Sequence, residues 1–358
     1  MLTIDAHLDL AWNALTYERD LLRSVHTIRQ TEAPMNGKSR AMNTVALPEM
    51  RHGQVFLSVA TLLARASGRP APGIEYASVP QAHAIAKGQL AYYRALEAAG
   101  HVRVIETARQ LDAHVKAWRK PGAQESAPLG FVLSMEGADP ITSPDELRDW
   151  HALGLRLLGP AHYGPNRYAG GTGTELGLTD DIGVKLLKQM QRLGMGLDCT
   201  HLSDQAFWQA LAKFDGTVLA SHQNCRELAP LQRQFSDSQI KAIIERDGVL
   251  GASFDIVMVR SGWQFAARNN LHDPQPVLMR EIVDHIDHIC QLAGNARHCG
   301  IGSDLDGGFG REQSPRDLDT IADLALMEGL LRDRGYKSAD VEAIMHGNWL
   351  RLLRRVLA

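Results

Sequence analysis

The fold class that the sequence predicts is α/β, a (β/α)8 TIM barrel formed by residues 1–358 as a single domain. Eight short apolar runs, rich in glycine and β-branched residues, alternate with longer segments of helical periodicity. Because the runs are almost continuously apolar, they suit parallel strands that are covered on both faces. Repetition of strand and helix implies right-handed βαβ units, and eight strands fit a closed barrel better than an open sheet.

The expected elements follow one another along the whole chain. Strands are expected at residues 3–7, 54–61, 130–136, 155–162, 195–201, 217–222, 249–255 and 298–304. Helices are expected at residues 82–99, 180–193, 204–213, 237–246, 277–293, 318–334 and 339–357. Ser203 is a typical N-cap residue before the third helix, and Gly194 and Gly294 are typical C-cap residues after the second and fifth.

An open, doubly wound sheet is the alternative fold, but no GxGxxG fingerprint follows the first apolar run. Two segments are interpreted as loops, residues 66–80 and 163–177, because both are rich in glycine. The second loop follows an expected strand. It should therefore lie on the barrel face that carries function.

The composition limits the partners that we expect. The net charge is −3 and no long basic or acidic run occurs, which argues against nucleic acid or an anionic membrane surface. The chain lacks an apolar run of about 18 residues and a signal-peptide pattern, so we expect a cytoplasmic protein without a membrane span. The four cysteines form no CxxC pair, which predicts a reducing compartment and no disulfide framework.

Metal-ligand side chains recur where the expected strands end. His7 and Asp9 are two residues apart, so along a strand they point to one face, as two ligands of a divalent metal would. The carboxyl ends of parallel barrel strands share one rim, and a buried ionisable group without a partner costs several kcal/mol. A cation at that rim would provide the partner. The set comprises His7, Asp9, Glu136, His162, His201, His222, Asp255 and Asp304.

The ligand types indicate the metal. Imidazoles and carboxylates without a thiolate favour Zn²⁺, with Mn²⁺, Co²⁺ or Fe²⁺ as alternatives. One open tetrahedral site needs fewer ligands than the five strongest candidates, which are His7, Asp9, Glu136, His201 and His222. A bridging carboxylate would let them hold two ions about 3.5–4 Å apart that share a hydroxide.

Six short motifs together resemble the renal (membrane) dipeptidase family of zinc peptidases. The likeness covers nearly the whole chain. Each motif alone is short, but the six motifs in this order are specific to the family. The motifs are IDAHLD at 4–9, SMEG at 134–137, LDCTHLS at 197–203, ASH at 220–222, GSDLDG at 302–307 and HGNWLR at 346–351.

This resemblance implies a barrel of the metal-dependent hydrolase type with two zinc ions, or Mn²⁺ or Co²⁺ in their place. His7 and Asp9 would bind one ion, and His201 and His222 the other. Glu136 would bridge both ions together with a hydroxide. It would take the place of the carboxylated lysine found in many related amidohydrolases.

The resemblance also assigns three residues to catalysis and substrate binding. His162 would contact the substrate and the developing oxyanion, and Asp304 would handle the proton. Arg233 would hold the terminal carboxylate of the substrate. The residues alone leave an alternative for each. His162 could be a hydrogen-bonded loop histidine and Asp304 a partner of a ligand histidine. Arg233 could be a surface arginine on a solvated turn.

Two departures from the family pattern concern substrate recognition. Gln234 follows Arg233, where the family often has asparagine, and Asp255 takes a place where tyrosine is common. Asp255 is left open between a substrate contact and a loop cap. His285 and His288 have the i, i+3 spacing of a metal pair, but we expect them on a solvated helix face away from the rim.

The implied function is metal-dependent hydrolysis of small dipeptides of the form L-Xaa-Xaa, including those with a D residue second. The first alternative keeps the metal and changes the bond, as in a lactonase, deaminase or phosphoesterase on the same barrel. The second alternative is a non-catalytic metal-binding barrel. We allow for a homodimer, although no feature of the sequence requires one.

Overall fold

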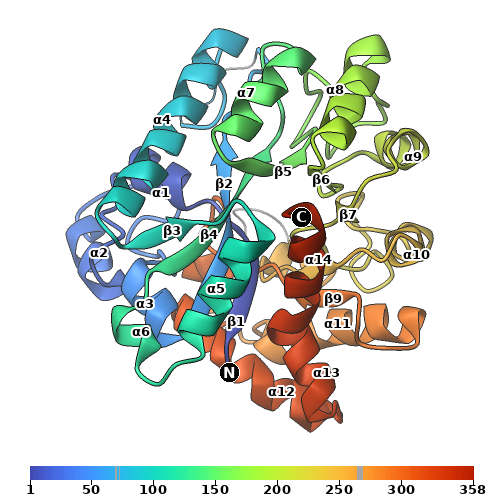
Figure 1. Cartoon of the computed structure of the whole chain (residues 1–358). Coiled ribbons are helices and arrows are strands. Elements are labelled where there is room, and N and C mark those ends of the chain that lie inside the picture. The colour runs from blue at the N-terminus through green and yellow to red at the C-terminus, as the bar shows by residue number, and fades with distance from the viewer. Residues whose placement is uncertain (69–70, 72, 264–268) are drawn as a thin grey trace.

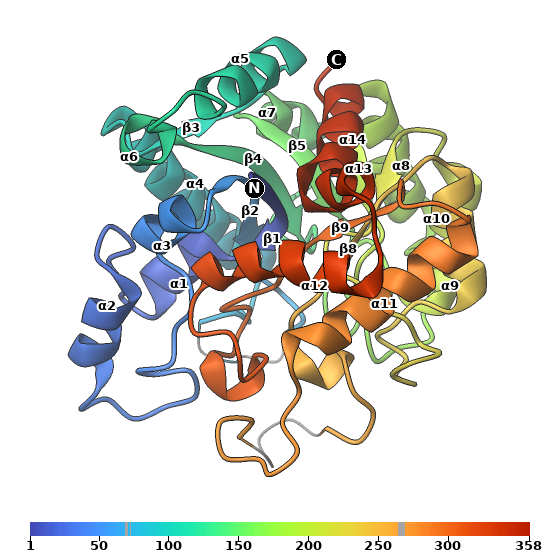
Figure 2. The ribbon, with the colours of Figure 1, turned by 90° about the horizontal axis from the view of Figure 1, so that it is seen from below.

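The computed structural model describes residues 1–68, 71, 73–263 and 269–358. Its centre is a ring of parallel strands, and helices surround the ring (Figure 1, Figure 2). The predicted (β/α)8 barrel is confirmed. The strands are β1 (Thr3–Leu8), β2 (Val55–Leu63), β3 (Val102–Val104), β4 (Leu129–Glu136), β5 (Leu155–Gly159), β6 (Gly196–Asp198), β7 (Val218–Leu219), β8 (Leu250–Ala252) and β9 (Cys299–Ile301).

The ring is made by eight of these strands in the order β7-β6-β5-β4-β2-β1-β9-β8. It closes between β7 and β8, because Ala220, just past β7, forms a parallel bridge with Leu250 of β8. The backbone N–H of Ala220 donates to the carbonyl of Val249 at 3.0 Å. The short strand β3 lies outside the ring order and pairs with the start of β4. Its three residues are too few to produce a strand pattern in the sequence.

All eight predicted strands exist, but several end earlier than predicted, because side chains take over the backbone hydrogen bonds. The Asp5 carboxylate accepts the N–H of Ser303 at 2.8 Å, two residues beyond β9. The Asp198 carboxylate accepts the N–H of Ser221 at 3.0 Å, two residues beyond β7. Since a carboxylate replaces the neighbouring strand's carbonyl there, the ladder stops and the chain turns over the rim.

The helices are more numerous than predicted, and several are shorter. The first third of the chain and its C-terminal end contain α1 (Leu10–Thr16), α2 (Val25–Glu32), α3 (Leu47–His52), α4 (Val79–Ala98), α5 (Ala108–Trp118), α6 (Ala123–Ser126), α12 (Met327–Arg334), α13 (Ser338–Glu342) and α14 (Asn348–Val356). Between them lie α7 (Leu147–Ala152), α8 (Asp180–Arg192), α9 (Asp204–Lys213), α10 (Asp237–Glu245) and α11 (Met279–Ala293). Short turns of 3-10 helix are η1 (Pro144–Glu146), η2 (Ile256–Met258), η3 (Arg311–Gln313) and η4 (Ile321–Leu326).

The predicted helix 318–334 divides into η4 and α12, and the predicted helix 339–357 is interrupted by a π-helical turn, η5 (Ala343–Gly347). Helices α8 to α11 match their predictions closely. Ser203 caps α9 by accepting the N–H of Ala206, and Gly294 ends α11 in the left-handed region at φ 66°. In the expected loop 66–80, residues 69–70 and 72 lie outside the described residues.

The prediction of a solvated face for His285 and His288 is wrong for His285. His285 on α11 is buried, accepts the N–H of Cys225 through Nδ1 at 3.1 Å and donates from Nε2 to the carbonyl of Val259 at 2.9 Å. Its helix turns this face inward and fastens the loops after β7 and β8. His288 is half-buried and pairs with Asp237 at 2.7 Å.

The four cysteines are buried and free, as the prediction of no disulfide framework requires. Across the part of the chain that the structure describes, none of the helices combines the length and the apolar character that crossing a membrane requires. Cytoplasmic location and a homodimer stay predictions.

Candidate metal centre

Seven of the predicted site residues lie together on the carboxyl-terminal rim of the barrel, and all seven are buried. His7 lies within β1 and Asp9 directly follows it, while Glu136 is the last residue of β4. The other four were predicted to be the last residues of strands. Instead, each lies three residues beyond the end of its strand, in a loop over the rim. These are His162 after β5, His201 after β6, His222 after β7 and Asp304 after β9.

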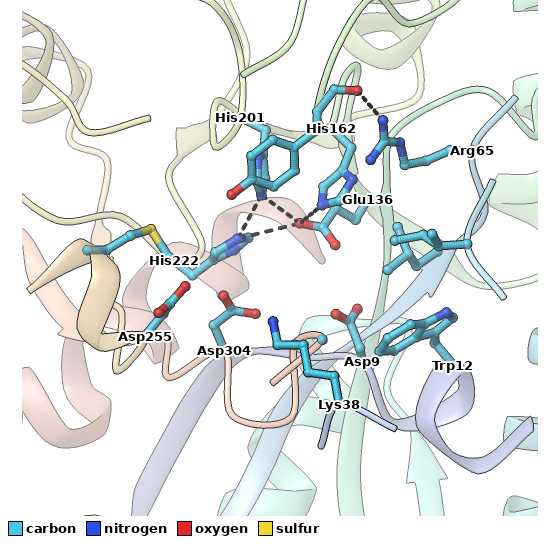
Figure 3. A pocket seen from close by; sticks show the side chains of 16 residues that line it. Asp9, Trp12, Lys38, Arg65, Glu136, His162, His201, His222, Asp255 and Asp304 are labelled. Carbon is cyan, nitrogen blue, oxygen red and sulfur yellow. Dashed lines mark hydrogen bonds and ion pairs between the residues drawn. The ribbon is translucent and has the colours of Figure 1, made fainter. Parts of the chain in front are cut away.

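Glu136 is at the centre of the group, and its two carboxylate oxygens face different histidines. Oε2 lies 3.6 Å from Nε2 of His7. Oε1 lies 3.1 Å from Nε2 of His201, 3.4 Å from Nε2 of His222 and 3.8 Å from Nε2 of His162 (Figure 3). One carboxylate thus lies between the nitrogen of His7 on one side and three histidine nitrogens on the other, as a bridging ligand would.

His7 has a buried ring nitrogen that needs a ligand. Its Nε2 has no hydrogen-bond partner among the described residues, although buried polar atoms are nearly always paired. Three carboxylates surround this atom. Oδ1 of Asp9 lies at 3.7 Å and Oδ1 of Asp304 at 3.9 Å, in addition to Glu136. A cation placed among them would satisfy the nitrogen and the carboxylates together.

Hydroxyl groups orient the rings of three histidines. Thr172 Oγ1 lies 3.0 Å from Nδ1 of His201. Ser221 Oγ lies 3.0 Å from Nδ1 of His222 and 3.3 Å from Nδ1 of His7. With each Nδ1 occupied, the Nε2 atoms face inward, and those of His201 and His222 are 3.1 Å apart. Such outer hydrogen bonds are how proteins fix the tautomer and direction of metal-binding imidazoles.

Burial and charge set the protonation of the cluster. Burial lowers the pKa of His162, His201 and His222 well below the ordinary histidine value, so these rings are neutral and can donate a lone pair. Burial raises the pKa of Asp304 well above its ordinary value, and the neighbouring carboxylates of Asp9 and Glu136 raise it further. Crowded acids of this kind become stable as anions when a cation is bound between them.

The backbone is strained at two of these residues. His201 has φ 67° and Asp304 has φ 60°, in the left-handed region that non-glycine residues seldom adopt. Strain of this kind collects at functional sites, where the surrounding structure holds it. Nearby, a Cβ on Gly302 would lie 1.7 Å from the carbonyl oxygen of Ser221, so only glycine lets these loops approach.

The donor set fits a metal. The described chain has three groups of ligand residues, and within each group the ligand atoms lie within 4.8 Å of one another. All of these atoms are histidine nitrogens or carboxylate oxygens of buried residues. Such donors suit Zn²⁺, Mn²⁺ or Co²⁺. The groups overlap at His7 and Glu136, which is the arrangement of adjacent rather than separate sites. They are His7 with Asp9 and Glu136, His7 with His222 and Asp304, and Glu136 with His162 and His201.

Arg233 is buried beside the centre and is not a surface arginine. Its guanidinium donates to the carbonyl of His222 at 3.0 Å and to Oε1 of Gln223 at 2.6 Å, and it lies 3.4 Å from Nε2 of His201. Its Nε has no hydrogen-bond partner among the described residues. A fixed cation next to the cluster is suited to bind an anionic group.

Asp255 is a loop cap, one of the two descriptions that the sequence left open, and substrate contact stays a prediction. Its Oδ1 accepts the N–H of Val257 at 3.0 Å, which caps η2, and the side-chain amide of Gln313 at 2.8 Å. The same carboxylate lines the cavity over the centre (Figure 3). Burial raises the pKa of Asp255 to about 6.

The cavity over the centre has a volume of about 280 Å³. Its lining includes Trp12, Lys38, Arg65 and Tyr163, which were not predicted as site residues from the sequence. The supporting hydroxyls of Thr61, Thr172 and Ser221 were also missed. Two carried a signal: Ser221 precedes His222, and Thr61, which donates to Asp9, ends the predicted strand 54–61. Thr172 carried none beyond its place in the glycine-rich loop.

A parallel barrel with buried imidazoles and carboxylates on its carboxyl-terminal rim is the architecture of TIM-barrel metal-dependent hydrolases. The family model described as membrane dipeptidase, peptidase family M19, matches residues 1–358. The chain therefore belongs to the membrane dipeptidase family, as its motifs indicate.

Individual proteins are similar to this chain over about two thirds of its length. The chain is 30% identical over 242 residues to an uncharacterized protein in the pqqA 5' region of Klebsiella pneumoniae, a match that covers 65% of this chain and 84% of that protein. It is 27% identical over 246 residues to dipeptidase aclJ of Aspergillus oryzae, which covers 68% of this chain and 54% of aclJ. This chain thus spans only about half of aclJ.

Two solved structures share the fold over nearly their full length. The crystal structure of dipeptidase AC, a metallopeptidase of family M19, has a TM-score of 0.79 at 24% identity and covers 100% of this chain and 99% of that chain. A Rhodobacter sphaeroides metallopeptidase, liganded with a phosphinate mimic of the dipeptide L-Ala-D-Ala, has a TM-score of 0.78 at 23% identity and covers 99% of each chain.

Proposed function

We propose that this protein is a metal-dependent dipeptidase whose reaction takes place at the Glu136 centre. The observation that carries the proposal is Glu136 itself, with Oε2 3.6 Å from His7 and Oε1 3.1 Å from His201. A buried carboxylate between His7 on one side and the neutral imidazoles of His201 and His222 on the other supports a site for two adjacent ions. Membership of the membrane dipeptidase family supplies the reaction class.

In this proposal His7 and Asp9 would hold one ion, His201 and His222 would hold the other, and Glu136 would serve both. Zinc is the proposed metal, with Mn²⁺ or Co²⁺ as substitutes. When bound, two such ions would supply a Lewis acid for the scissile carbonyl and lower the pKa of a water molecule.

Asp304 and His162 carry the remaining chemistry. The Asp304 carboxylate, 3.9 Å from His7 Nε2, would take the proton of the attacking water and give it to the leaving amine. The His162 ring lines the cavity from the opposite side and would donate a hydrogen bond to the developing oxyanion. One such donor contributes about 3 kcal/mol to the transition state.

Arg233 and the carboxylates around the cavity would select both ends of the substrate. The buried guanidinium would bind the terminal carboxylate, while the rim carboxylates would receive the free amino group. With both ends of the substrate bound in this way, longer peptides would be excluded. The liganded Rhodobacter sphaeroides relative, bound to an L-Ala-D-Ala mimic, supports including dipeptides with a D residue second.

The direct test is an assay of the purified protein, stripped with a chelator and then reloaded with Zn²⁺, on L-L and L-D dipeptides. Hydrolysis of free dipeptides is expected, with none of the corresponding N-acetylated tripeptides. A preference for a lactone or a phosphodiester would favour the alternative hydrolases. Turnover that needs no metal would overturn the proposal.

A Glu136→Gln variant tests the bridge separately. The amide preserves the shape but removes the charge that holds two ions, so bound zinc should fall from two ions to one or none per chain. Glu175→Gln, an exposed change in the loop over the rim, is the matched control. Two tightly bound ions in Glu136→Gln would contradict the bridging role.

A further inference from the structure

A second cavity, of about 400 Å³, adjoins the first. Tyr163, Asp255 and Met258 line both cavities, so these residues form the neck between them. Arg233 lies in the wall of the second cavity, while its guanidinium reaches the carbonyl of His222 beside the metal centre. A molecule held by Arg233 can therefore extend into both cavities.

The position of Arg233 decides which part of a dipeptide enters the second cavity, given the proposed function. The scissile carbonyl lies at the metal centre and the terminal carboxylate lies on Arg233. The Cα of the second residue must lie between these two points, at the neck. Its side chain then projects away from the metal centre, into the second cavity.

The walls of the second cavity are mostly apolar beyond the neck. Leu231, Val257, Met258 and Trp263 form them, and Thr172, Gly173 and Gln232 complete the lining. Among the described lining residues only Arg233 and Asp255 are charged. Arg233 is engaged with the substrate carboxylate in this arrangement, and Asp255 Oδ1 already accepts two hydrogen bonds.

The volume and the charges together point to one class of side chain. A volume of about 400 Å³ is ample for a large side chain. A charged side chain would lose its water shell there without gaining a committed partner, which is costly. An apolar side chain would gain the full benefit of burial against Leu231, Val257 and Trp263.

We propose that this cavity selects dipeptides whose second residue carries a large apolar side chain, such as leucine, methionine or phenylalanine. The inference rests on the proposed function. It adds the substrate class, which is set by residues of the loops after β7 and β8 and not by the metal ligands.

The test measures kcat/KM of the zinc-loaded protein on dipeptides that share alanine as the first residue. They are Ala-Gly and both the L and the D forms, at the second residue, of Ala-Leu, Ala-Phe, Ala-Asp and Ala-Lys. In whichever of the L or D series is hydrolysed faster, kcat/KM for Ala-Leu and Ala-Phe should exceed that for Ala-Gly and the charged substrates by about 10-fold or more. Equal rates, or preference for Ala-Asp or Ala-Lys, would overturn the inference while leaving the dipeptidase proposal intact. No hydrolysis of any dipeptide would overturn the proposed function as well.

A matched pair of variants locates the preference. Leu231→Asp places an unpaired carboxylate in the cavity wall, and should lower the ratio of kcat/KM for Ala-Phe over Ala-Gly about 10-fold. Leu228→Asp makes the same change three residues away at a side chain that is 38% exposed and lines neither cavity, so the ratio should stay as in the parent protein. Leu231→Ala, which adds no charge, should lower the ratio by a smaller factor. An unchanged ratio in both Leu231 variants would refute the assignment.

Discussion

Thr172 Oγ1 lies 3.0 Å from Nδ1 of His201, although the two residues come from different loops of the barrel rim. Thr172 belongs to the glycine-rich loop after β5, and His201 lies beyond β6 in a left-handed backbone conformation. The hydroxyl holds the ring so that Nε2 faces Glu136 at 3.1 Å. The loop therefore positions a proposed metal ligand as well as covering the site.

Replacing this hydroxyl should weaken metal binding without removing a ligand. For Thr172→Val we expect zinc affinity to fall about 10- to 100-fold, because the ring loses the contact that fixes its tautomer and direction. A competition titration against a chromophoric chelator measures this. Thr174→Val, in the same loop but bonded to the carbonyl of Gly171, should bind zinc like the parent protein. Equal affinity in both variants would show that Thr172 does not position His201.

Asp304 and Asp306 should respond differently to the same change, although they are two residues apart. Asp304→Asn removes the proposed proton carrier, so kcat should fall at least about 100-fold while the bound metal stays near the parent level. Metal analysis alongside steady-state kinetics separates the two effects. A fall in kcat that is explained by metal loss would assign Asp304 to metal binding instead.

Asp306→Asn should instead lower stability. The Asp306 carboxylate accepts hydrogen bonds from the backbone N–H of Thr44 at 2.7 Å, from the Thr44 hydroxyl at 2.8 Å and from the N–H of Val45 at 3.0 Å. The guanidinium of Arg19 lies 3.6 Å away. Loss of a buried, charge-assisted group of this kind costs about 1–3 kcal/mol in the free energy of unfolding. Urea unfolding of the zinc-loaded protein measures it. A variant as stable as the parent protein would contradict this structural role.

Arg233→Lys should damage recognition of the substrate carboxylate. A lysine keeps the charge but cannot make the paired contacts of a guanidinium, so kcat/KM for dipeptides should fall about 10-fold or more, chiefly through KM. On dipeptide amides, which lack the carboxylate, the parent protein and the variant should be alike. Arg226→Lys, in an ion pair with Asp204 on the same segment, serves as the control. An equal loss on amides would show that Arg233 acts by supporting His222 alone.

Asp255 should make the stability of the metal-free protein depend on pH. Burial raises its pKa from 3.8 to about 6, so between these values the folded protein holds a proton that the unfolded chain has lost. The contribution of this group to stability therefore falls as pH rises through that window. Asp255→Asn, which keeps the Oδ1 acceptor, should gain up to about 3 kcal/mol relative to the parent protein between pH 4 and pH 7. Urea unfolding across this range checks the slope, and a constant difference would refute it.

The sequence predicted much of the barrel because apolar continuity and helical spacing depend on local residues. The eight barrel strands and helices α8 to α11 were recognisable in this way. The extents of the strands after β5 were not, since Asp5, Asp198 and similar side chains replace ladder hydrogen bonds only after distant segments have come together. The strand β3 was missed because three residues are too few to give a strand pattern. The inward face of His285 was missed because its partners Cys225 and Val259 come from distant loops.

By itself, the sequence determined the fold class and the chemical kinds of side chain at the site, because a parallel barrel brings all carboxyl strand ends to one rim whatever the details. Only the tertiary structure decided how these side chains meet. The two oxygens of Glu136 face different histidines, Arg233 is buried rather than solvated, and a second apolar cavity lies beyond it. Distances between atoms from separate loops depend on the packing of the whole ring, and no local pattern in the chain encodes them.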